Sequence, residues 1–250
     1  MLQQTFSHLP GIGATTEQRL WRAGLCDWRA LAERGGEALR GARAEEARRA
    51  AEESLVRFER GDWRWFDAAL PTDAKWRAFG ELGHRALYVD IETDGGFGAD
   101  AITVIGCYDG TTAHTFVAGR DLDAARELIE NFPLVVTYNG ASFDMPLIRQ
   151  RFPCNAFNHI HVDLRFPLHR LGLRGGLKII EQMVGIERGP LAQGLDGWDA
   201  VRLWHEWQNG RARSLEILLA YNREDIVNLA PLMRLAFDKL KLEISAVLNG

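Results

Sequence analysis

Hydrophobic and polar residues follow two different patterns along this chain. Between residues 6 and 60, apolar side chains recur at helical spacing among Arg, Ala and Glu residues, as at Leu20, Trp21, Leu25, Trp28 and Leu31. From residue 84 onward, short apolar runs of strand length alternate with longer amphipathic stretches. The pattern therefore predicts a small all-α region followed by a domain in which strands and helices alternate.

Short apolar runs bounded by turn residues predict the strands of the second region. We expect them at residues 88–93, 102–108, 113–117, 134–138 and 159–164. Asp109-Gly110 has the composition of a hairpin turn, so the first three strands should form a meander. Helices are expected at residues 122–131, capped by Asp121, at 177–184, at 198–208, and from Ser214 onward with a kink near Pro231. This order predicts a mixed α/β sheet flanked by helices.

Composition divides the chain into four parts. Residues 1–60 are the helical region, in which residues 42–60 are expected to form one solvated helix with mixed charges. Residues 61–83 are a connector with too many aromatic side chains for a floppy linker, so we expect it to be pinned to the domain surface. The α/β domain is assigned to residues 84–240 and a C-terminal tail to residues 241–250.

The overall composition is that of a soluble globular protein with a substantial core. Of the 250 residues, 46% are hydrophobic and 26% are charged. No apolar run is long enough to span a membrane, and the first residues lack the pattern of a secretion signal. Cys26, Cys107 and Cys154 are far apart and odd in number, which suggests neither a disulfide framework nor a thiolate zinc site and fits a cytoplasmic location.

The distribution of charge does not by itself predict nucleic-acid binding. The net charge is −4. Residues 1–80 carry 13 basic and 12 acidic side chains, and residues 81–250 carry 17 and 22. A metal-loaded acidic site would reconcile a negative domain with a phosphate substrate, because bound cations invert the local field.

Candidate chemistry begins with two acids on one strand. In Tyr88-Val89-Asp90-Ile91-Glu92-Thr93, strand alternation places Asp90 and Glu92 on the same face, about 7 Å apart along the chain. Val89 and Ile91 would then point into a core. Neighbouring carboxylates repel each other unless they face water or a cation, and hard divalent ions prefer such oxygen ligands.

Two further stretches carry acids in suggestive settings. Asn139-Gly140-Ala141-Ser142-Phe143-Asp144 follows a buried strand, at the kind of position where ligands gather in α/β sheets. Taken alone, Asp144 could equally be a helix N-cap. Tyr221 and Asp225 are four residues apart on a predicted helix, so they share one face. Taken alone, they could be an ordinary buried tyrosine–carboxylate hydrogen bond.

Together, the three stretches resemble the DEDD exonuclease superfamily of the ribonuclease H-like fold. The order of the motifs and their strand, turn and helix settings agree over residues 84–240. The sequence is similar to the tyrosine subtype, because the histidine subtype would have His where this chain has Ala220. It is also similar to the YprB-type predicted exonucleases of bacteria, which carry a Leu-Pro-Gly-Ile-Gly segment ahead of this domain. The loop Asp94–Gly98 departs from the Thr-Gly-Leu-like turn of many relatives.

The resemblance implies a 3′→5′ exonuclease that removes nucleotides by two-metal-ion hydrolysis. Asp90, Glu92, Asp144 and Asp225 would hold two Mg²⁺ or Mn²⁺ ions about 3.5–4 Å apart. Tyr221 would orient the attacking water. The implied partner is nucleic acid, DNA or RNA with single-stranded 3′ ends, and no protein partner can be inferred.

Other residues are expected to contact the substrate. Asn139 would hydrogen-bond the nucleotide or brace the turn, and Phe143 would pack against the last base or lie in the core. A basic run could track phosphates or form a solvated face, and it comprises Arg165, His169, Arg170, Arg174 and Lys178. Of these, Arg170 and Lys178 are the candidate substrate-binding residues.

The N-terminal region offers a second candidate contact. Gly11 and Gly13 flank Ile12 just before a predicted helix, which allows a turn whose N–H groups cradle a phosphate. The segment resembles the helix-hairpin-helix family, which binds DNA backbone without reading sequence. The alternative is a helical hairpin that packs on the main domain and binds nothing.

Two further groups of residues are expected to be structural, and two rival functions remain open. His159, His161 and Asp163 are expected to be mainly structural, with Asp163 nearest the site. Trp198, Leu203, Trp204 and Trp207 lie at helical spacing and are expected to pack in the core. The rival functions are a catalytically quiet nucleic-acid-binding module and a metal-dependent phosphodiesterase acting on small nucleotides.

Overall fold

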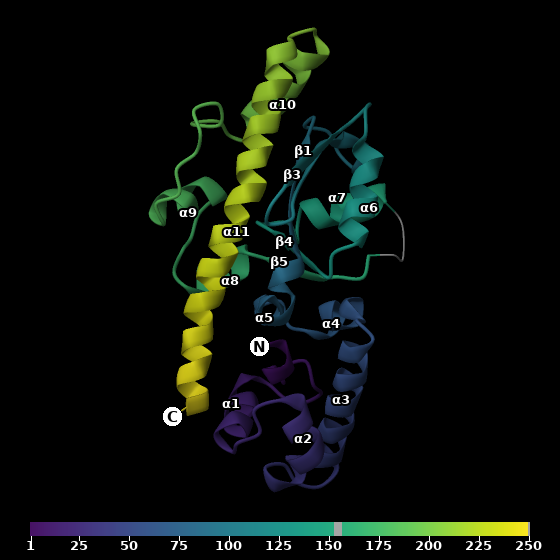
Figure 1. The fold of residues 1–250 in the computed structure, drawn as a ribbon, viewed down its shortest axis with the longest axis vertical. Helices are drawn as coiled ribbons and strands as arrows, with labels where there is room; N and C mark the ends of the chain where they lie inside the picture. Colours follow the sequence, from purple (N-terminus) through teal and green to yellow (C-terminus); the bar gives the residue numbers. More distant parts are fainter. Residues whose placement is uncertain (153–156, 250) are drawn as a thin grey trace.

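The centre of the molecule is a mixed sheet (Figure 1). The computed structural model describes residues 1–152 and 157–249, so Cys154 lies outside the described residues. Within them the sheet has five strands in the order β3-β2-β1-β4-β5. These are β1 (Ala86–Thr93), β2 (Ile102–Tyr108), β3 (Ala113–Val117), β4 (Leu134–Thr137) and β5 (Ile160–Asp163). The predicted mixed α/β architecture is confirmed.

The antiparallel and parallel halves of the sheet meet at β1. Strand β1 pairs antiparallel with β2, and β2 pairs antiparallel with β3 through the predicted turn at Asp109-Gly110. On its other side, β1 pairs parallel with β4 over Ala86–Tyr88, and β4 pairs parallel with β5. The second half of β1, which carries Asp90 and Glu92, therefore extends beyond its pairing with β4.

Side-chain alternation along β1 divides its residues between two faces. Val89 and Ile91 are buried in a cluster with α6 (Ala125–Glu130) and α7 (Asp144–Arg151). The neighbouring residue Tyr88 belongs to a different cluster, which includes side chains of the C-terminal helix. Asp90 and Glu92 share this second face, as the strand period predicts.

Besides α6 and α7, the α/β domain contains the helices α8 (Arg165–Arg170), α9 (Leu177–Met183) and α10 (Gly197–Gln208). The expected helices at 177–184 and 198–208 are confirmed to within one residue. The expected helix at 122–131 is instead a 3-10 turn at Leu122–Ala124 followed by α6. Asp121 is the N-cap residue of the 3-10 turn, as expected, but its side chain makes no capping hydrogen bond. Its carboxylate instead accepts the Val117 N–H at 2.7 Å and closes the end of β3.

The longest element is α11 (Ala212–Asn249), which runs along most of the length of the molecule (Figure 1). At 1.5 Å per residue its 38 residues span about 57 Å. The helix continues without interruption across Pro231, and it includes residues 241–249, for which we expected a tail. It continues because its second half buries an apolar stripe, including Leu240 and Ile244, against the N-terminal region.

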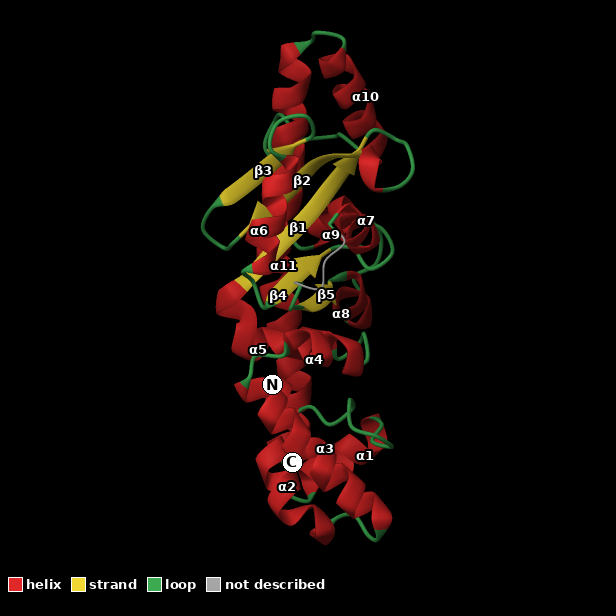
Figure 2. Ribbon diagram, turned by 90° about the vertical axis from the view of Figure 1, so that its right-hand side faces the viewer, coloured by secondary structure: helices red, strands yellow, loops and turns green. Residues whose placement is uncertain are grey.

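The N-terminal region is helical, as predicted, and lies at one end of the sheet (Figure 2). Helix α3 is not fully solvated, because Ala47 and Ala51 are buried. Short 3-10 turns occur at Leu2–Gln4, Gly35–Glu37, Lys75–Ala78 and Gly83–Arg85. The helices are α1 (Ala14–Arg22), α2 (Trp28–Arg34), α3 (Ala42–Glu59), α4 (Trp63–Ala69) and α5 (Phe79–Leu82).

The N-terminal helices and the sheet share one hydrophobic cluster. In the connector, the rings of Trp76 and Phe79 lie 6.0 and 5.3 Å from the ring of Phe237 on α11. Glu17 of α1 forms a buried bidentate ion pair with Arg77, over 2.9 and 3.0 Å. The connector is therefore pinned by its aromatic side chains, as expected from its composition.

One prediction about packing is wrong. Leu203 and Trp204 of α10 are buried, but Trp198 near its start has 80% of its side chain exposed. Helical spacing alone does not reveal where a helix leaves the core, and Trp198 lies in the first turn, beyond the buried stretch. Among the described residues, no helix is both long and apolar enough to cross a bilayer.

Candidate metal centre

Asp90 and Glu92 lie in the second half of β1, on the face of the strand that is turned toward α11. In the sheet register, Asp90 is opposite Gly106 of β2. A Cβ added at Gly106 would lie 2.0 Å from Oδ1 of Asn222 on α11. Glycine at this position therefore leaves the room in which α11 approaches the two acids.

Asp144 enters the site from the other side of the sheet, at the first residue of α7. It does not cap the helix, whose N-cap residue is Phe143. Its carboxylate instead accepts the N–H of Ile91 at 3.1 Å, where β1 has passed its pairing with β4. A backbone donor of the central strand thus fixes Asp144 beside Asp90 and Glu92.

Tyr221 and Asp225 complete the group from α11, one helical turn apart and both buried. Asp90, Glu92 and Asp225 each offer a carboxylate oxygen, and these oxygens all lie within 4.8 Å of one another. Asp144 and Tyr221 join them in lining a cavity of about 210 Å³. The structure therefore brings together all five residues that the sequence singled out as catalytic.

Burial and mutual repulsion oppose the ionisation of these acids. Burial raises the pKa of Asp90 well above its ordinary value, and the charges of Asp225, Asp144 and Glu92 raise it further. Burial likewise raises the pKa of Glu92, and that of Asp144 to about 7. Burial raises the pKa of Asp225, although the neighbouring Arg188 opposes the shift. Clustered carboxylates with raised pKa values indicate a site in which a bound cation would stabilise the ionised form of the acids.

The donor set fits a hard divalent cation. Carboxylate oxygens from two separate segments, β1 and α11, converge, and the described residues place no cysteine or histidine among the clustered ligands. Mg²⁺ and Mn²⁺ take such oxygen ligands. Asp90, Glu92 and Asp225 are the residues positioned to hold one cation.

Two polar residues that sequence reasoning missed contact the acids directly. The side-chain amide of Asn222 donates to Oδ2 of Asp90 at 3.1 Å and to Oε1 of Glu92 at 3.5 Å. Arg188, from the loop after α9, donates to Oδ1 of Asp225. Asn222 lies three residues before Asp225, so helical spacing was an available signal. No local signal marks Arg188, because tertiary folding alone brings its loop to α11.

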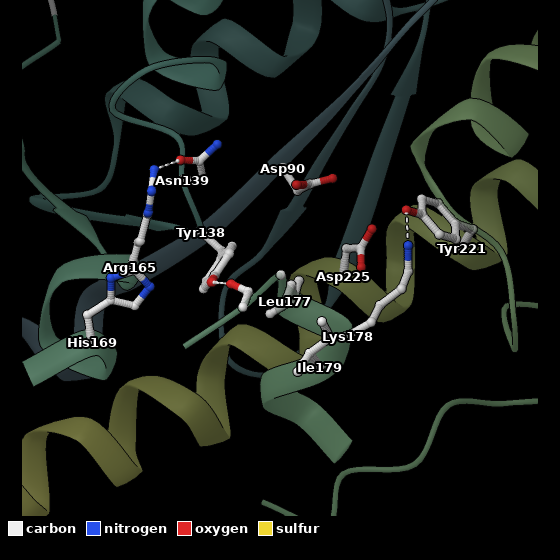
Figure 3. A pocket seen from close by; sticks show the side chains of 12 residues that line it. Asp90, Tyr138, Asn139, Arg165, His169, Leu177, Lys178, Ile179, Tyr221 and Asp225 are labelled. Atoms are coloured by element: carbon white, nitrogen blue, oxygen red, sulfur yellow. Dashed lines mark hydrogen bonds between the residues drawn. The ribbon is translucent and has the colours of Figure 1, made fainter. Parts of the chain in front are cut away.

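Tyr221 has a charged partner. Nζ of Lys178 on α9 donates to the Tyr221 hydroxyl oxygen at 2.6 Å, a contact visible in Figure 3. The pKa of Tyr221 is raised by burial and then by the carboxylates of Asp225, Glu92 and Asp90, so the phenol keeps its proton. Lys178, which the sequence suggested as a phosphate contact, is thus hydrogen-bonded to the predicted catalytic tyrosine.

A larger cavity of about 780 Å³ adjoins the acids (Figure 3). Asp90, Tyr221 and Asp225 line it together with basic side chains from α8 and α9. These basic residues are Arg165, His169 and Lys178, three members of the run noted in the sequence. Carboxylates and basic side chains therefore line the cavity together.

The turn after β4 is braced toward this cavity. Asn139 has φ of +62°, the only positive value among the described non-glycine residues. Asp163 of β5 accepts the N–H groups of Asn139 and Ala141 at 2.8 and 3.1 Å. The Asn139 side-chain oxygen accepts from Arg165 at 2.8 Å. Asn139 thus lines the cavity in a strained conformation that Asp163 and Arg165 support.

The remaining candidates are placed as follows. Phe143 lines the smaller cavity and is 45% exposed. Arg170 forms an ion pair with Glu243 at 2.8 Å and lines neither of the two cavities beside the acids. Gly11, with φ of +69°, and Gly13, the N-cap residue of α1, lie in the N-terminal region and are not part of the acidic cluster.

His159, just before β5, and His161, on β5, lie outside the cluster. His161 pairs with the Thr137 hydroxyl at 2.8 Å, and burial lowers its pKa to about 3. Burial also lowers the pKa of His159 to about 4. Both are therefore neutral near pH 7, in keeping with the structural role expected for them.

One comparison with known proteins, the match to a family model, agrees with this fold. The family model described as the RNase H superfamily matches residues 87–237. Curated proteins give no match. Among solved structures, the family B DNA polymerase from the hyperthermophilic archaeon Pyrobaculum calidifontis is similar, with a TM-score of 0.48 and 16% sequence identity. The match covers 63% of this chain and 24% of the polymerase, so the chain spans about a quarter of that protein.

Fold and site together define an α/β protein with an acidic centre on the middle strand of a mixed sheet. The chain belongs to the RNase H superfamily.

Proposed function

We propose that the protein is a divalent-metal-dependent 3′→5′ exonuclease of the tyrosine type. The observation that carries the proposal is the convergence of Asp90, Glu92, Asp144, Tyr221 and Asp225 in one cavity. These residues come from three segments that are far apart in the sequence. A repulsive carboxylate cluster of this kind is costly in a folded protein unless it serves to bind cations.

Each side chain has a defined task in this proposal. Asp90, Glu92 and Asp225 would hold one Mg²⁺ or Mn²⁺ ion, and Asp144 would complete the acidic set for a second. When bound, such ions activate water and neutralise charge on the leaving oxygen of a phosphodiester. Tyr221, neutral and oriented by Lys178, would direct the attacking water through its hydroxyl. The reaction adds water across the phosphodiester, breaks the bond to the 3′ oxygen and releases a nucleoside monophosphate.

The larger cavity would receive the end of the strand. Arg165 and His169 line it beside the acids and are suited to contact backbone phosphates. Phe143 is half-exposed beside the carboxylates, where it could stack on the terminal base. These placements favour a nucleic-acid end as substrate, and the chemistry is common to DNA and RNA.

The test is a polarity and substrate panel with purified protein. Single-stranded DNA and RNA oligonucleotides, labelled at either end, are incubated with Mn²⁺, Mg²⁺ or EDTA. We expect 5′-labelled strands to shorten one nucleotide at a time and 3′-labelled strands to release a labelled mononucleotide at once. Asp225→Asn should abolish cleavage, and an exposed substitution such as Asp123→Asn should not, since Asp123 has 78% of its side chain exposed.

Three results would contradict the proposal. Cleavage that is unaffected by EDTA would exclude the metal centre. Release of the 5′ label first would reverse the polarity. Hydrolysis of a small nucleotide ester without any action on oligonucleotides would favour the small-nucleotide phosphodiesterase.

We also propose that the turn at Gly11–Gly13 contacts the backbone of long substrates. Gly13 precedes α1 directly, and a Cβ there would meet no atom within 4 Å, so its surface is open. Gly13→Val should leave the fold intact but weaken binding of long strands, while dinucleotide cleavage stays unchanged. Gly36→Val is the matched control, because Gly36 is equally open in the same region. Unchanged binding by Gly13→Val would leave the region a purely structural role.

A further inference from the structure

Arg188 reaches the acidic centre from the loop between α9 and α10. Its Nη2 donates to Oδ1 of Asp225, and its side chain is only 7% exposed. Its guanidinium also lies 5.7 Å from the centre of the Tyr221 ring. One buried cation from outside the predicted motifs therefore contacts two residues of the centre.

The guanidinium also binds a second carboxylate, that of Glu181. Nε and Nη2 of Arg188 donate to the two oxygens of Glu181 on α9, at 2.6 and 2.7 Å. Glu181 is itself 1% exposed and accepts the side-chain amide of Asn228 on α11 at 3.0 Å. This clamp fixes the plane of the guanidinium, and with it the direction of its bond to Asp225.

The loop around Arg188 is seated on the same turn of α11. The N–H of Gly189 donates to Oε1 of Glu224, the residue before Asp225, at 3.3 Å. Arg188 and Gly189 thus contact two consecutive residues of the helix. The backbone next to Arg188 is therefore docked on the helix turn that carries Asp225.

We propose that Arg188 is a positioning residue that orients Asp225 for cation binding. This inference rests on the metal centre of the proposed function. One oxygen of Asp225 is occupied by the guanidinium, which leaves the other as the oxygen that meets a cation with Asp90 and Glu92. Hydrogen bonds to a ligating carboxylate commonly set its orientation and its affinity for metal.

The charges around Arg188 show whether it orients Asp225 or competes with the cation for that carboxylate. A lone arginine beside a cation site would repel the cation and compete for Asp225. Here the positive charge of Arg188 is offset by the bidentate carboxylate of Glu181, so the pair brings little net charge to the site. The pair fixes the direction in which the Arg188 guanidinium donates to Asp225. Removing the pair should therefore weaken metal binding.

The test measures Mn²⁺ affinity by electron paramagnetic resonance in the absence of nucleic acid. Arg188→Lys keeps the charge but lacks the planar fork that bridges Glu181 and Asp225. Glu181→Gln leaves Arg188 in place but weakens its anchor. We expect each variant to raise the Kd for Mn²⁺ by about 10–100-fold. Arg202→Lys, the same change at an exposed ion pair on α10, should leave the Kd unchanged.

A double variant controls for the possibility that the single variants fail to fold. Arg188→Met with Glu181→Met removes both buried charges at once, which buried ion pairs commonly tolerate. Its unfolding is followed without metal, so that a folded protein with weakened Mn²⁺ binding supports the proposal. Unchanged or tighter Mn²⁺ binding in the folded variants would overturn it, and tighter binding would make Arg188 a competitor of the cation.

The same titration separates failure of this inference from failure of the proposed function. If the unsubstituted protein binds no Mn²⁺, or if Asp90→Asn does not change the Kd, the metal centre itself is wrong. If Asp90→Asn abolishes binding but the Arg188 and Glu181 variants bind normally, only the positioning role is wrong.

Discussion

The ammonium group of Lys178 donates a hydrogen bond to the hydroxyl oxygen of Tyr221, with 2.6 Å between the two atoms. This contact joins α9 to α11 at the edge of the acidic cavity. Because the lysine can only donate, the phenolic proton is left free to be donated toward the cavity. The pair therefore presents Tyr221 as an oriented hydrogen-bond donor.

Removing the tyrosine hydroxyl should slow turnover without affecting metal binding. Tyr221→Phe is expected to lower kcat about 100-fold, because one positioned hydrogen-bonding group at the reacting centre is lost. Lys178→Met should lower kcat by less, since the hydroxyl remains but loses its partner. The double variant should be no slower than Tyr221→Phe alone, because the two residues act as a unit.

Single-turnover rates and Mn²⁺ titrations would check this prediction. If the effects of Tyr221→Phe and Lys178→Met multiply in the double variant, the two residues act independently. An unchanged kcat in Tyr221→Phe would remove the tyrosine from the mechanism.

Asp144 should make the metal-free protein less stable as the pH rises from about 4 to about 7. Burial raises the pKa of the folded carboxyl to about 7 from its ordinary value of 3.8. Across that window the unfolded chain loses this proton and the folded protein keeps it, so stability falls with pH. Each pKa unit of difference corresponds to about 1.4 kcal/mol.

The comparison with Asp144→Asn isolates this effect. Asparagine still offers an oxygen to the Ile91 N–H, but it carries no titrating proton. Urea unfolding in EDTA should show the variant gaining stability relative to the unsubstituted protein between pH 4 and pH 7. A stability difference that does not change with pH would contradict the prediction.

Asn222 should matter most when no metal is bound. Its amide bridges the carboxylates of Asp90 and Glu92, so Asn222→Ala should lower the free energy of unfolding in EDTA by about 1–3 kcal/mol. A bound cation would take over part of this charge compensation. Added Mn²⁺ should therefore raise the Tm of Asn222→Ala more than that of the unsubstituted protein.

The exposed Asn209 at the end of α10 provides the control for this measurement, since Asn209→Ala removes an amide that contacts a backbone carbonyl and no carboxylate. Equal increases in Tm for all three proteins would show that Asn222 only fills space. The prediction concerns the difference between metal-free and metal-loaded protein, so a general loss of packing does not mimic it.

Trp198 should contribute to substrate binding and little to stability. It is 80% exposed, and the preceding residue, Gly197, lines the small cavity with Phe143. Stacking of a base on an aromatic ring contributes about 1–3 kcal/mol, so Trp198→Ala should raise KM for single-stranded oligonucleotides by roughly 5–150-fold. Trp204→Ala, which removes a buried ring of the same helix, should instead destabilise the protein by about 3–5 kcal/mol.

Steady-state kinetics and thermal unfolding of the two variants would separate these roles. A normal KM in Trp198→Ala would show that the exposed ring does not meet the substrate. A marked fall in Tm for Trp198→Ala would show that it packs, as the helical spacing first suggested.

Local periodicity determined much of the candidate centre. The strand period placed Asp90 and Glu92 on one face and Val89 and Ile91 on the other, because side chains alternate regardless of what packs on them. The helix period likewise put Tyr221 and Asp225 on one face. These placements depend on a few neighbouring residues, which is why the sequence alone could specify them.

Only the tertiary structure decided which groups surround the acids and how far the last helix runs. Asn222 reaches Asp90 because Gly106, on a different strand, leaves it room. Arg188 and Lys178 reach Asp225 and Tyr221 because α9 and its loop dock on α11. Helix α11 continues through residues 241–249 because the N-terminal helices cover its apolar stripe. Such contacts join residues distant in the chain, and no local pattern encodes the packing that brings them together.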